Sequence, residues 1–325
     1  AWSGAGLDFE YSWEDGGGGV ATAVGGEATD VVDVDAPMGA WDSAVRAEAL
    51  RIRLRDEAAE LHRAEKHAKT WRAPESYGDL GRELLLPDTE PSWRIEGLLG
   101  NGHNAVLIAA RKAGKTTMVN EFVRSYVDGE MFLGTQPITV TGRGVAVLNY
   151  EVDERQYRRW IGAVGIRNVH LVHVLHLRGR SLPLTNARVQ AWVAAWLRDR
   201  DIGAWVLDPY SRAYIGSVQN GNDEAQVSGF LDSLDVIKSE AGVGELVMPV
   251  HTPKGRAEEG EESAIGSQRL EGWPDVMWYL TRQGRARYLR AEGRDIYLRE
   301  TELQYDDATR RLRMELFGND RKTAR

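Results

Sequence analysis

Residues 104–117 read N-A-V-L-I-A-A-R-K-A-G-K-T-T, and this stretch decides the fold class. It begins with a short apolar run, which is typical of a buried strand, and a helical pattern follows Gly114-Lys115-Thr116. A strand, a tight loop and a helix in this order are the context of a phosphate-binding loop of the pattern G-x-x-x-x-G-K-[ST]. Ala109 stands at the position of the first glycine. Alanine can replace glycine wherever the backbone does not need a positive φ, so the loop is still predicted to work.

The predicted loop supplies the groups that a nucleoside triphosphate needs. Backbone N–H groups and the positive end of the following helix surround an anion there. Gly114 lets the backbone approach the phosphates, Lys115 reaches the β- and γ-oxygens, and the Thr116 hydroxyl ligates Mg²⁺. We therefore predict binding of ATP and Mg²⁺. The predicted contacts are Ala109, Ala110, Arg111, Lys112, Ala113, Gly114, Lys115, Thr116 and Thr117.

Strands and helices alternate along the chain as far as about residue 250. The pattern predicts an α/β fold with a mostly parallel central sheet and helices on both faces. Asp153 and Gln156 have the spacing of a capping box at the start of one helix. After residue 274 hairpin strands follow, one turning at Asp306-Asp307, and predict antiparallel C-terminal strands. The apolar runs lie at 104–110, 144–150, 169–175, 205–208 and 246–250, with helices predicted after 114 and 153 and over 185–200 and 223–240.

Two acidic residues follow apolar runs at the carboxyl edge of the predicted sheet, where ligands of such folds bind. W-V-L-D ends in Asp208, which we predict to share Mg²⁺ with Thr116, although an aspartate before a proline can also simply begin a turn. Hydrolysis needs a further group that orients or deprotonates water. Pro209 follows Asp208, so Glu151, which ends L-N-Y-E on what we expect to be an adjacent strand, is the predicted base. A role for Glu151 at the next helix N-terminus is the alternative, but Asp153 serves that helix better.

Histidines end or interrupt the later apolar runs. His251 ends V-M-P-V-H, where its side chain could hydrogen-bond the γ-phosphate and pass its presence to the following loop; a surface histidine near a turn is the alternative. His170, His173 and His176 are spaced by three residues, which could indicate a metal site. In a strand this spacing alternates between the two faces, so we predict that they bind no metal.

The N-terminal region differs from the rest in composition. Residues 1–40 contain eight acidic residues, no lysine or arginine, and the run G-G-G-G, and are predicted to be disordered. Residues 41–73 are predicted to be a helical arm, with a helix over 41–70 whose narrow apolar stripe includes Val45, Ile52 and Leu61. This helix is either a solvated linker or an arm that docks on a neighbouring subunit. The ATPase domain is expected to span 74–325.

Composition leaves nucleic acid possible as a partner. The net charge of −8 comes from residues 1–40, since the other residues carry 41 basic and 41 acidic side chains. The chain has no cysteine, which fits a reducing cytoplasm, and no apolar run approaches a membrane span. We expect a cytoplasmic protein of a bacterial or phage-infected cell, without a membrane partner.

Five motifs together resemble the RecA-like hexameric helicase ATPases of plasmids and phages, the RepA-type group. They are A-A-R-K-A-G-K-T-T, L-N-Y-E-V-D, W-V-L-D-P-Y-S-R, V-H-T-P-K and G-S-Q-R-L-E-G-W-P-D-V-M-W-Y-L, and they cover about residues 90–300. The resemblance implies a homohexameric ring with ATP between subunits, translocation on single-stranded DNA, and replication partners such as a primase. It also implies that Glu151 activates water and that His251 senses the γ-phosphate.

The resemblance further implies an arginine finger and a DNA-binding channel. The family's late strand carries Lys-x-Arg, and here A-E-G-R-D places Arg294 at the arginine position and Glu292 where the lysine would stand. Arg290 is the competing candidate for the finger. DNA contacts are expected from Arg212, Lys254 and Arg256, although the loop after His251 also carries four glutamates, which would repel DNA.

Two functional hypotheses remain open from the sequence. The first is a DNA motor, most simply a replicative helicase. The second is a RecA-like recombination or strand-annealing accessory ATPase that binds DNA without unwinding it. Both would use Lys115, Glu151 and Asp208, so these residues do not separate them. A small-molecule kinase is disfavoured because no basic lid segment follows the central strands.

Overall fold

The computed structural model of the chain divides into two compact units, Ala1–Pro87 and Asp88–Arg325. The domain boundary that we expected at residue 74 stays a prediction. The structure describes residues 8–13, 19–24, 31–33, 45–55, 58, 79–87, 92–215, 217, 224–252 and 268–315.

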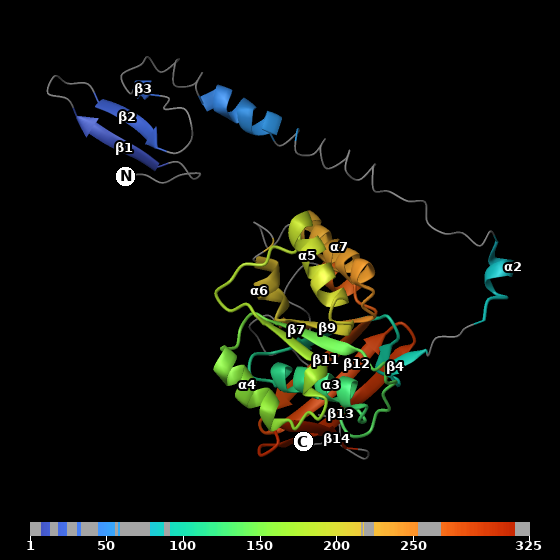
Figure 1. Cartoon of the computed structure of the whole chain (residues 1–325). Coiled ribbons are helices and arrows are strands. Elements are labelled where there is room, and N and C mark those ends of the chain that lie inside the picture. Colours follow the sequence, from blue (N-terminus) through green and yellow to red (C-terminus); the bar gives the residue numbers. More distant parts are fainter. Residues whose placement is uncertain are drawn as a thin grey trace. The chain divides into compact units, whose positions relative to one another are not determined.

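The N-terminal unit contains a three-stranded antiparallel sheet, in the order β1 (Asp8–Trp13), β2 (Gly19–Val24) and β3 (Val31–Asp33) (Figure 1). These strands lie within residues 1–40, for which disorder was predicted from composition. The segment D-F-E-Y-S-W alternates polar and aromatic residues, which is the period of a strand. The expectation rested on composition, which does not register such alternation.

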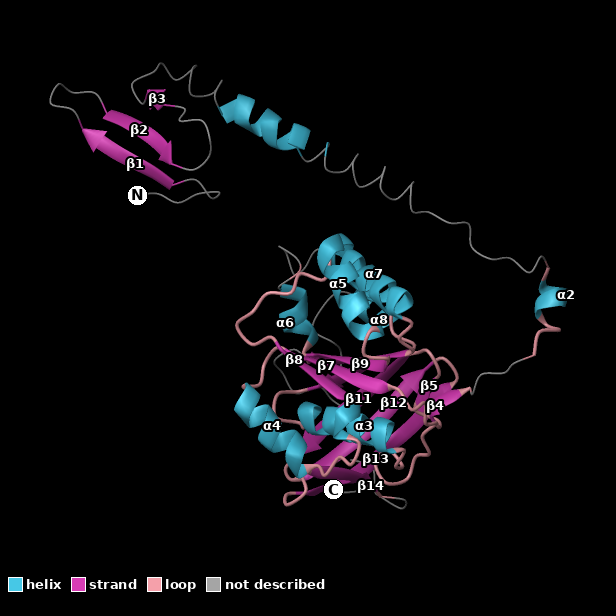
Figure 2. Ribbon diagram, in the orientation of Figure 1, coloured by secondary structure: helices cyan, strands magenta, loops and turns pink. Residues whose placement is uncertain are grey.

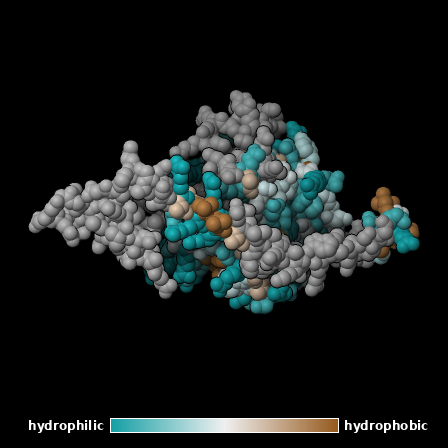
Figure 3. Space-filling view, turned by 90° about the horizontal axis from the view of Figure 1, so that it is seen from above, coloured by the Kyte–Doolittle hydropathy of each residue, from teal (hydrophilic) through white to brown (hydrophobic). Residues whose placement is uncertain are grey.

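Helical segments follow in the same unit. Residues 45–55 are helical and exposed, in agreement with part of the helix predicted over 41–70. Leu61 and most of the remaining positions of that prediction lie outside the described residues. A short helix, α2 (Leu80–Glu83), is capped by the Asp79 side chain and is surrounded by exposed leucines, which form the brown group at the right-hand edge of Figure 3.

The C-terminal unit is built on a nine-stranded sheet with the order β14-β13-β12-β11-β6-β10-β9-β7-β8. The strands from β11 to β8 are parallel, and β12, β13 and β14 are antiparallel, which confirms the predicted α/β class with a mostly parallel sheet and antiparallel C-terminal strands. A separate pair, β4 (Trp93–Ile95) and β5 (Leu99–Gly100), precedes the sheet. The sheet strands are β6 (Asn104–Ala109), β7 (Gly144–Asn149), β8 (Val172–His176), β9 (Ile202–Asp208), β10 (Glu245–His251), β11 (Val276–Gln283), β12 (Ala286–Gly293), β13 (Ile296–Asp306) and β14 (Arg311–Met314).

Helices cover both faces of this sheet, as predicted (Figure 2). Each face has its own apolar core, and the two cores are separated by the sheet. One face carries α3 (Lys115–Asp128) and α4 (Glu154–Ala163), and the other carries α5 (Ala187–Arg198), α6 (Tyr210–Ile215), α7 (Glu224–Ala241) and α8 (Gln268–Gly272). A 3-10 turn (Val169–Leu171) precedes β8. Among the helices, the sequence pattern indicated neither α6, which follows β9 after a single residue, nor the short α8.

The helix starts follow from local capping. Asp153 accepts hydrogen bonds from the backbone N–H groups of Arg155 and Gln156, which confirms the predicted N-cap of α4. Asn186 caps α5 in the same way. Helix α3 begins after Gly114 without a side-chain cap, so the N–H groups of its first turn remain for another acceptor.

The strand register brings the predicted site residues to one edge of the sheet. His251 at the end of β10 is paired with Ala109 at the end of β6, and Asn149 at the end of β7 is paired with Asp208 at the end of β9. We expected the strand before Glu151 to adjoin the strand of the phosphate-binding loop. This was wrong, because the later strands β9 and β10 lie between them.

In the described part of the chain, no helix is both long enough and apolar enough to span a bilayer.

Candidate nucleotide-binding site

The phosphate-binding loop joins β6 to α3. Ala109 is the last residue of β6 and does not adopt a positive φ, which explains why alanine is acceptable there. Lys112 and Gly114 do adopt positive φ angles, of 64° and 119°. Gly114 then leads into α3, whose first-turn N–H groups and dipole favour an anion.

Lys115 is almost buried, with 8% of its surface exposed. Its Nζ donates hydrogen bonds to the carbonyl oxygens of Ala109 and Ala110, at 2.9 and 3.0 Å, and lies 2.9 Å from Nδ1 of His251. Burial lowers the pKa of Lys115 to about 8, although Asp208 and Glu151 oppose the shift. The ammonium group is therefore held at the end of β6 by uncharged acceptors, where an anion would stabilise it.

Asp208 is also buried, with 5% of its surface exposed. Within the described residues its carboxylate has no hydrogen bond or ion pair, and burial together with the nearby Glu151 raises its pKa to about 7, while Lys115 acts in the opposite direction. A buried carboxylate without a partner is costly until a cation reaches it. This environment fits the predicted role of Asp208 as a ligand of Mg²⁺.

Glu151 lies in a turn that Asn149 organises. The Asn149 side chain donates to the Val152 carbonyl at 2.8 Å and accepts from the Val152 N–H at 2.9 Å, so the turn that contains Glu151 is closed from both sides. The Glu151 side chain is 56% exposed, and its Oε2 lies 3.9 Å from Nε2 of His251. Glu151 is therefore in contact with solvent while remaining next to the phosphate-binding loop.

His251 connects the lysine to the glutamate. Its Nδ1 faces Lys115 and its Nε2 faces Glu151. Burial and the Lys115 charge lower the pKa of His251, and Glu151 raises it less. A neutral imidazole can accept a hydrogen bond on one nitrogen and donate from the other. The structure thus brings together Lys115, His251, Glu151 and Asp208, all of which were predicted from the sequence.

The residues at this edge fit a magnesium–nucleotide complex. The carboxylate of Asp208 and the hydroxyl of Thr116 would hold Mg²⁺, and the loop with Lys115 would hold the phosphates. When bound, the metal neutralises charge on the phosphate oxygens. The structural support for this assignment is the unpaired buried carboxylate of Asp208 and the uncapped start of α3.

Two arginines that were not predicted from the sequence hold the outer side of the loop. Arg282 at the end of β11 donates to the Lys112 carbonyl at 3.2 Å, and Arg287 of β12 donates to the Ala113 carbonyl at 3.2 Å. The Arg287 guanidinium also lies over the Tyr305 ring, 4.3 Å from its centre. Lys112 is strained by its positive φ, so these bonds help to keep the loop in shape. No local motif in the sequence links these residues to the loop.

The predicted arginine finger is not part of this cluster. Arg294 donates to the Asp275 carboxylate at 2.6 Å, and the Asp275 N–H donates to the Asn104 carbonyl at the start of β6. Arg294 therefore lies at the edge of the sheet opposite to Lys115 of its own chain. The competing Arg290 lies over the Tyr279 ring and forms an ion pair with Glu292.

The predicted DNA contacts are only partly within the described residues. Arg212 lies on α6 and is exposed. Lys254 and Arg256 lie outside the described residues, so their predicted role remains a prediction.

His173 and His176 point to opposite faces of β8, as predicted, whereas His170 lies in the 3-10 turn before it. The His173 ring packs edge-on against Trp196 of α5, whereas His176 contacts Asn149 and the ring of Tyr157 on α4. Among the described residues no group of three or more His, Asp or Glu side chains is arranged to hold a metal ion.

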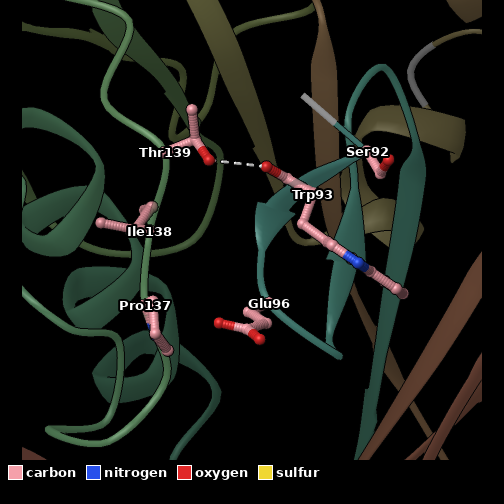
Figure 4. Close-up of a pocket in the computed structure, with 6 residues that line it drawn as sticks. All are labelled: Ser92, Trp93, Glu96, Pro137, Ile138 and Thr139. Carbon is pink, nitrogen blue, oxygen red and sulfur yellow. Dashed lines mark hydrogen bonds between the residues drawn. The ribbon is translucent and has the colours of Figure 1, made fainter. Parts of the chain in front are cut away.

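A separate pocket of about 270 Å³ lies between β4 and the segment that follows α3 (Figure 4). The neighbouring Arg94 forms an ion pair with Glu245 at the start of β10, so this pocket is near the edge of the sheet opposite to Lys115. It is lined by Ser92, Trp93, Glu96, Pro137, Ile138 and Thr139.

The fold and the site define a P-loop nucleotide-binding ATPase with a mostly parallel central sheet. The model of a protein family described as AAA domain matches residues 77–257, more than half of the sequence, and the chain belongs to this family. No curated protein sequence matches the chain. Among solved structures, a KaiC-like protein from the hyperthermophilic archaeon Pyrococcus horikoshii OT3 is similar, with 14% identity and a TM-score of 0.49, over 68% of this chain and 93% of that one.

Replacing Glu151 by glutamine should separate nucleotide binding from hydrolysis. The amide keeps the shape of the side chain but cannot take a proton, so ATP binding should persist while turnover falls on the order of 10²-fold or more. Titration with a fluorescent ATP analogue and phosphate release measure the two properties. Asp153→Asn is the matched control, because Asp153 caps α4. If the control variant stops hydrolysis and Glu151→Gln does not, Glu151 is not the base.

Replacing Arg287 by alanine should weaken ATP binding more than it slows turnover. The loss of one hydrogen bond to the loop predicts an increase of KM for ATP of about three- to tenfold with a smaller change in kcat. Arg285→Ala is the matched control, because Arg285 is exposed in the same hairpin and has no bond to the loop in the described structure. Steady-state kinetics would contradict the assignment if both variants had the wild-type KM.

Proposed function

We propose that this protein is an ATP-driven DNA motor, a replicative helicase of the phage or plasmid type that acts as a ring on single-stranded DNA. The observation that carries the proposal is the contact series Lys115–His251–Glu151. His251 is the last residue of β10, and the segment that follows it corresponds to the predicted channel loop. A change in the partners of Lys115 at the phosphate-binding loop therefore acts directly on His251, the residue at the start of that segment.

Each of the site residues has its own role in the proposed motor. Lys115 exchanges its carbonyl and histidine partners for phosphate oxygens, which releases Nδ1 of His251. Glu151 orients the attacking water and holds its proton, a role that fits its exposed position. Arg294 of one subunit completes the site of its neighbour, which fits its place at the opposite edge of the sheet. Arg212, Lys254 and Arg256 contact DNA, and a primase or other replication proteins are the expected partners.

The test is ATP hydrolysis with and without single-stranded DNA, followed by unwinding of a tailed duplex. A helicase should hydrolyse ATP faster with DNA and separate the strands. Lys115→Ala is the control, because this lysine contacts the ligand and should lose both activities while keeping the fold. If DNA stimulates hydrolysis but the strands are not separated, the protein is an accessory ATPase and not a helicase. An ATP hydrolysis rate that does not change when DNA is added would contradict the proposal of a DNA motor.

A mixing experiment tests the ring. Arg294→Ala and Lys115→Ala subunits should each be inactive, because an arginine finger contributes about 10³ to 10⁵ in rate and the loop lysine is required for binding. Mixed rings contain some interfaces with an intact loop and an intact finger, so part of the ATPase activity should return. If mixing restores nothing with Arg294→Ala but does so with Arg290→Ala, Arg290 is the finger. A monomer in sedimentation with ATP and DNA present would contradict the ring.

A further inference from the structure

Exposed arginines gather on two segments that follow β8 and β9. Arg178 and Arg180 lie in the loop 177–186, Arg188 lies in the first turn of α5, and Arg212 lies on α6. We call these four residues, together with Trp192 of α5, the arginine surface. Residues 177–198 contain no aspartate or glutamate. The positive charge of this segment is therefore not balanced within the segment.

The four arginines also have no partner elsewhere in the described part of the chain, where none forms a side-chain hydrogen bond, an ion pair or a ring contact. Many other arginines of the C-terminal unit are engaged. Examples of such pairs are Arg94–Glu245, Arg124–Glu130, Arg143–Asp201, Arg167–Glu130 and Arg311–Glu121. In an arginine-rich chain, a group that is left without acidic partners is available to an anion from outside.

The two segments are held together by Ser217. The Leu184 N–H donates to the Ser217 hydroxyl at 3.0 Å, and the Thr185 hydroxyl donates to the Ser217 carbonyl at 2.8 Å. The Ser217 hydroxyl in turn donates to the Ala213 carbonyl of α6, next to Arg212, at 2.9 Å. Figure 1 shows the loop passing from β8 beside α6 to α5. The arginines are therefore presented on one connected support.

The phosphates of the chain's own nucleotide are too far away to be the ligand of the arginines in the loop after β8. β8 is the edge strand, and β7, β9 and β10 separate it from β6, which carries the phosphate-binding loop. With about 4.8 Å between neighbouring strands, the loop after β8 is about 19 Å from that strand. Arg178 and Arg180, which this loop carries, therefore meet a second anion, whereas Arg212 on α6 follows β9, which is only two strands from β6. Because the guanidinium groups are spread over the loop 177–186, α5 and α6, an extended polyanion fits them better than a single phosphate.

Trp192 adds an aromatic surface beside the charges. It is 50% exposed and follows Arg188 by four residues, so both lie on the same face of α5. Ala191 and Ala195 on that face are too short to cover the indole ring. Figure 3 views the molecule from the side of α5 and α7, where hydrophilic residues make up much of the coloured surface. An exposed ring among arginines combines stacking with phosphate contacts, as single-stranded nucleic acid requires.

We propose that the arginine surface binds single-stranded DNA, with Arg178, Arg180, Arg188 and Arg212 on the phosphates and Trp192 against a base. This inference rests on the proposed DNA-dependent function and adds to it a contact surface outside the channel loop. The phosphates of a nucleotide in a neighbouring subunit are the other anion that these arginines could meet, and the experiment separates the two.

The experiment measures binding of the full chain, with a non-hydrolysable ATP analogue, to a fluorescent oligothymidylate at several salt concentrations. Each lost phosphate contact lowers the slope of log K against log salt by about 0.7 for single strands, so Arg178→Gln/Arg180→Gln should lower it by about 1.4 and weaken binding roughly 25-fold at 0.1 M salt. Arg53→Gln/Arg313→Gln removes the same charge from exposed sites elsewhere and should bind as wild type. Arg178→Lys/Arg180→Lys should keep the slope.

Trp192→Ala provides an independent readout. The loss of one stacked base predicts weaker binding by about fivefold or more with an unchanged salt slope, and Trp192→Phe should restore most of the affinity. Hydrolysis without DNA should be the same in all these variants.

Two results would overturn the inference while leaving the proposed function in place. The first is wild-type affinity and slope in Arg178→Gln/Arg180→Gln. The second is unchanged DNA binding with a loss of DNA-independent hydrolysis, which would assign the arginines to a neighbour's nucleotide. If the wild-type chain binds no DNA, the proposed function fails before any variant is compared, and the inference fails with it.

Discussion

The buried ammonium group of Lys115 is the constraint on which the site depends. It sits at the end of β6 with only carbonyl oxygens and an imidazole nitrogen as direct partners. A cation in such surroundings loses hydration that these partners only partly replace, and its lowered pKa reflects that cost. The loop must therefore be held by the rest of the fold. Arg282 and Arg287 hold its outer carbonyls, and β10 supplies His251 on its inner side.

The parallel register of the sheet makes this arrangement possible. The ends of β6, β10, β9 and β7 lie at one edge, and hydrogen bonds beyond the strands keep the loops aligned. The Tyr150 N–H donates to the Asp208 carbonyl at 2.9 Å, and the Leu177 N–H donates to the Asn149 carbonyl at 2.8 Å. Lys115 and His251 are more than 130 residues apart in the sequence, yet Nζ of Lys115 lies 2.9 Å from Nδ1 of His251. The same register places Arg178 and Arg180, which follow the edge strand β8, at the far end of that edge.

Much of the fold and of the site could be predicted from the sequence. The strand ends at Ala109, Asp208 and His251 are marked by apolar runs that stop at polar or small residues, so local pattern was enough. Strand order was not predictable in this way, because β9 and β10 lie between β6 and β7 through contacts between residues that are far apart in the sequence. The bonds of Arg282 and Arg287 to the loop depend on the β11–β12 hairpin lying beside it, which no local motif encodes. In residues 1–40, the composition is typical of disorder, whereas the alternation in β1 is a local pattern that composition does not describe.

The two carboxylates of the site differ in burial, and this difference supports different roles for them. Asp208 is buried and unpaired within the described structure, so its ionised form is unfavourable until a cation is present. A metal ion is the cation that such a group suits, since it binds the ionised oxygens directly. Glu151 is exposed at the end of a braced turn, where water reaches it and a proton can leave again. If the roles were reversed, the aspartate would have to exchange protons with solvent from a buried position. The environments therefore favour Asp208 for the metal and Glu151 for the water.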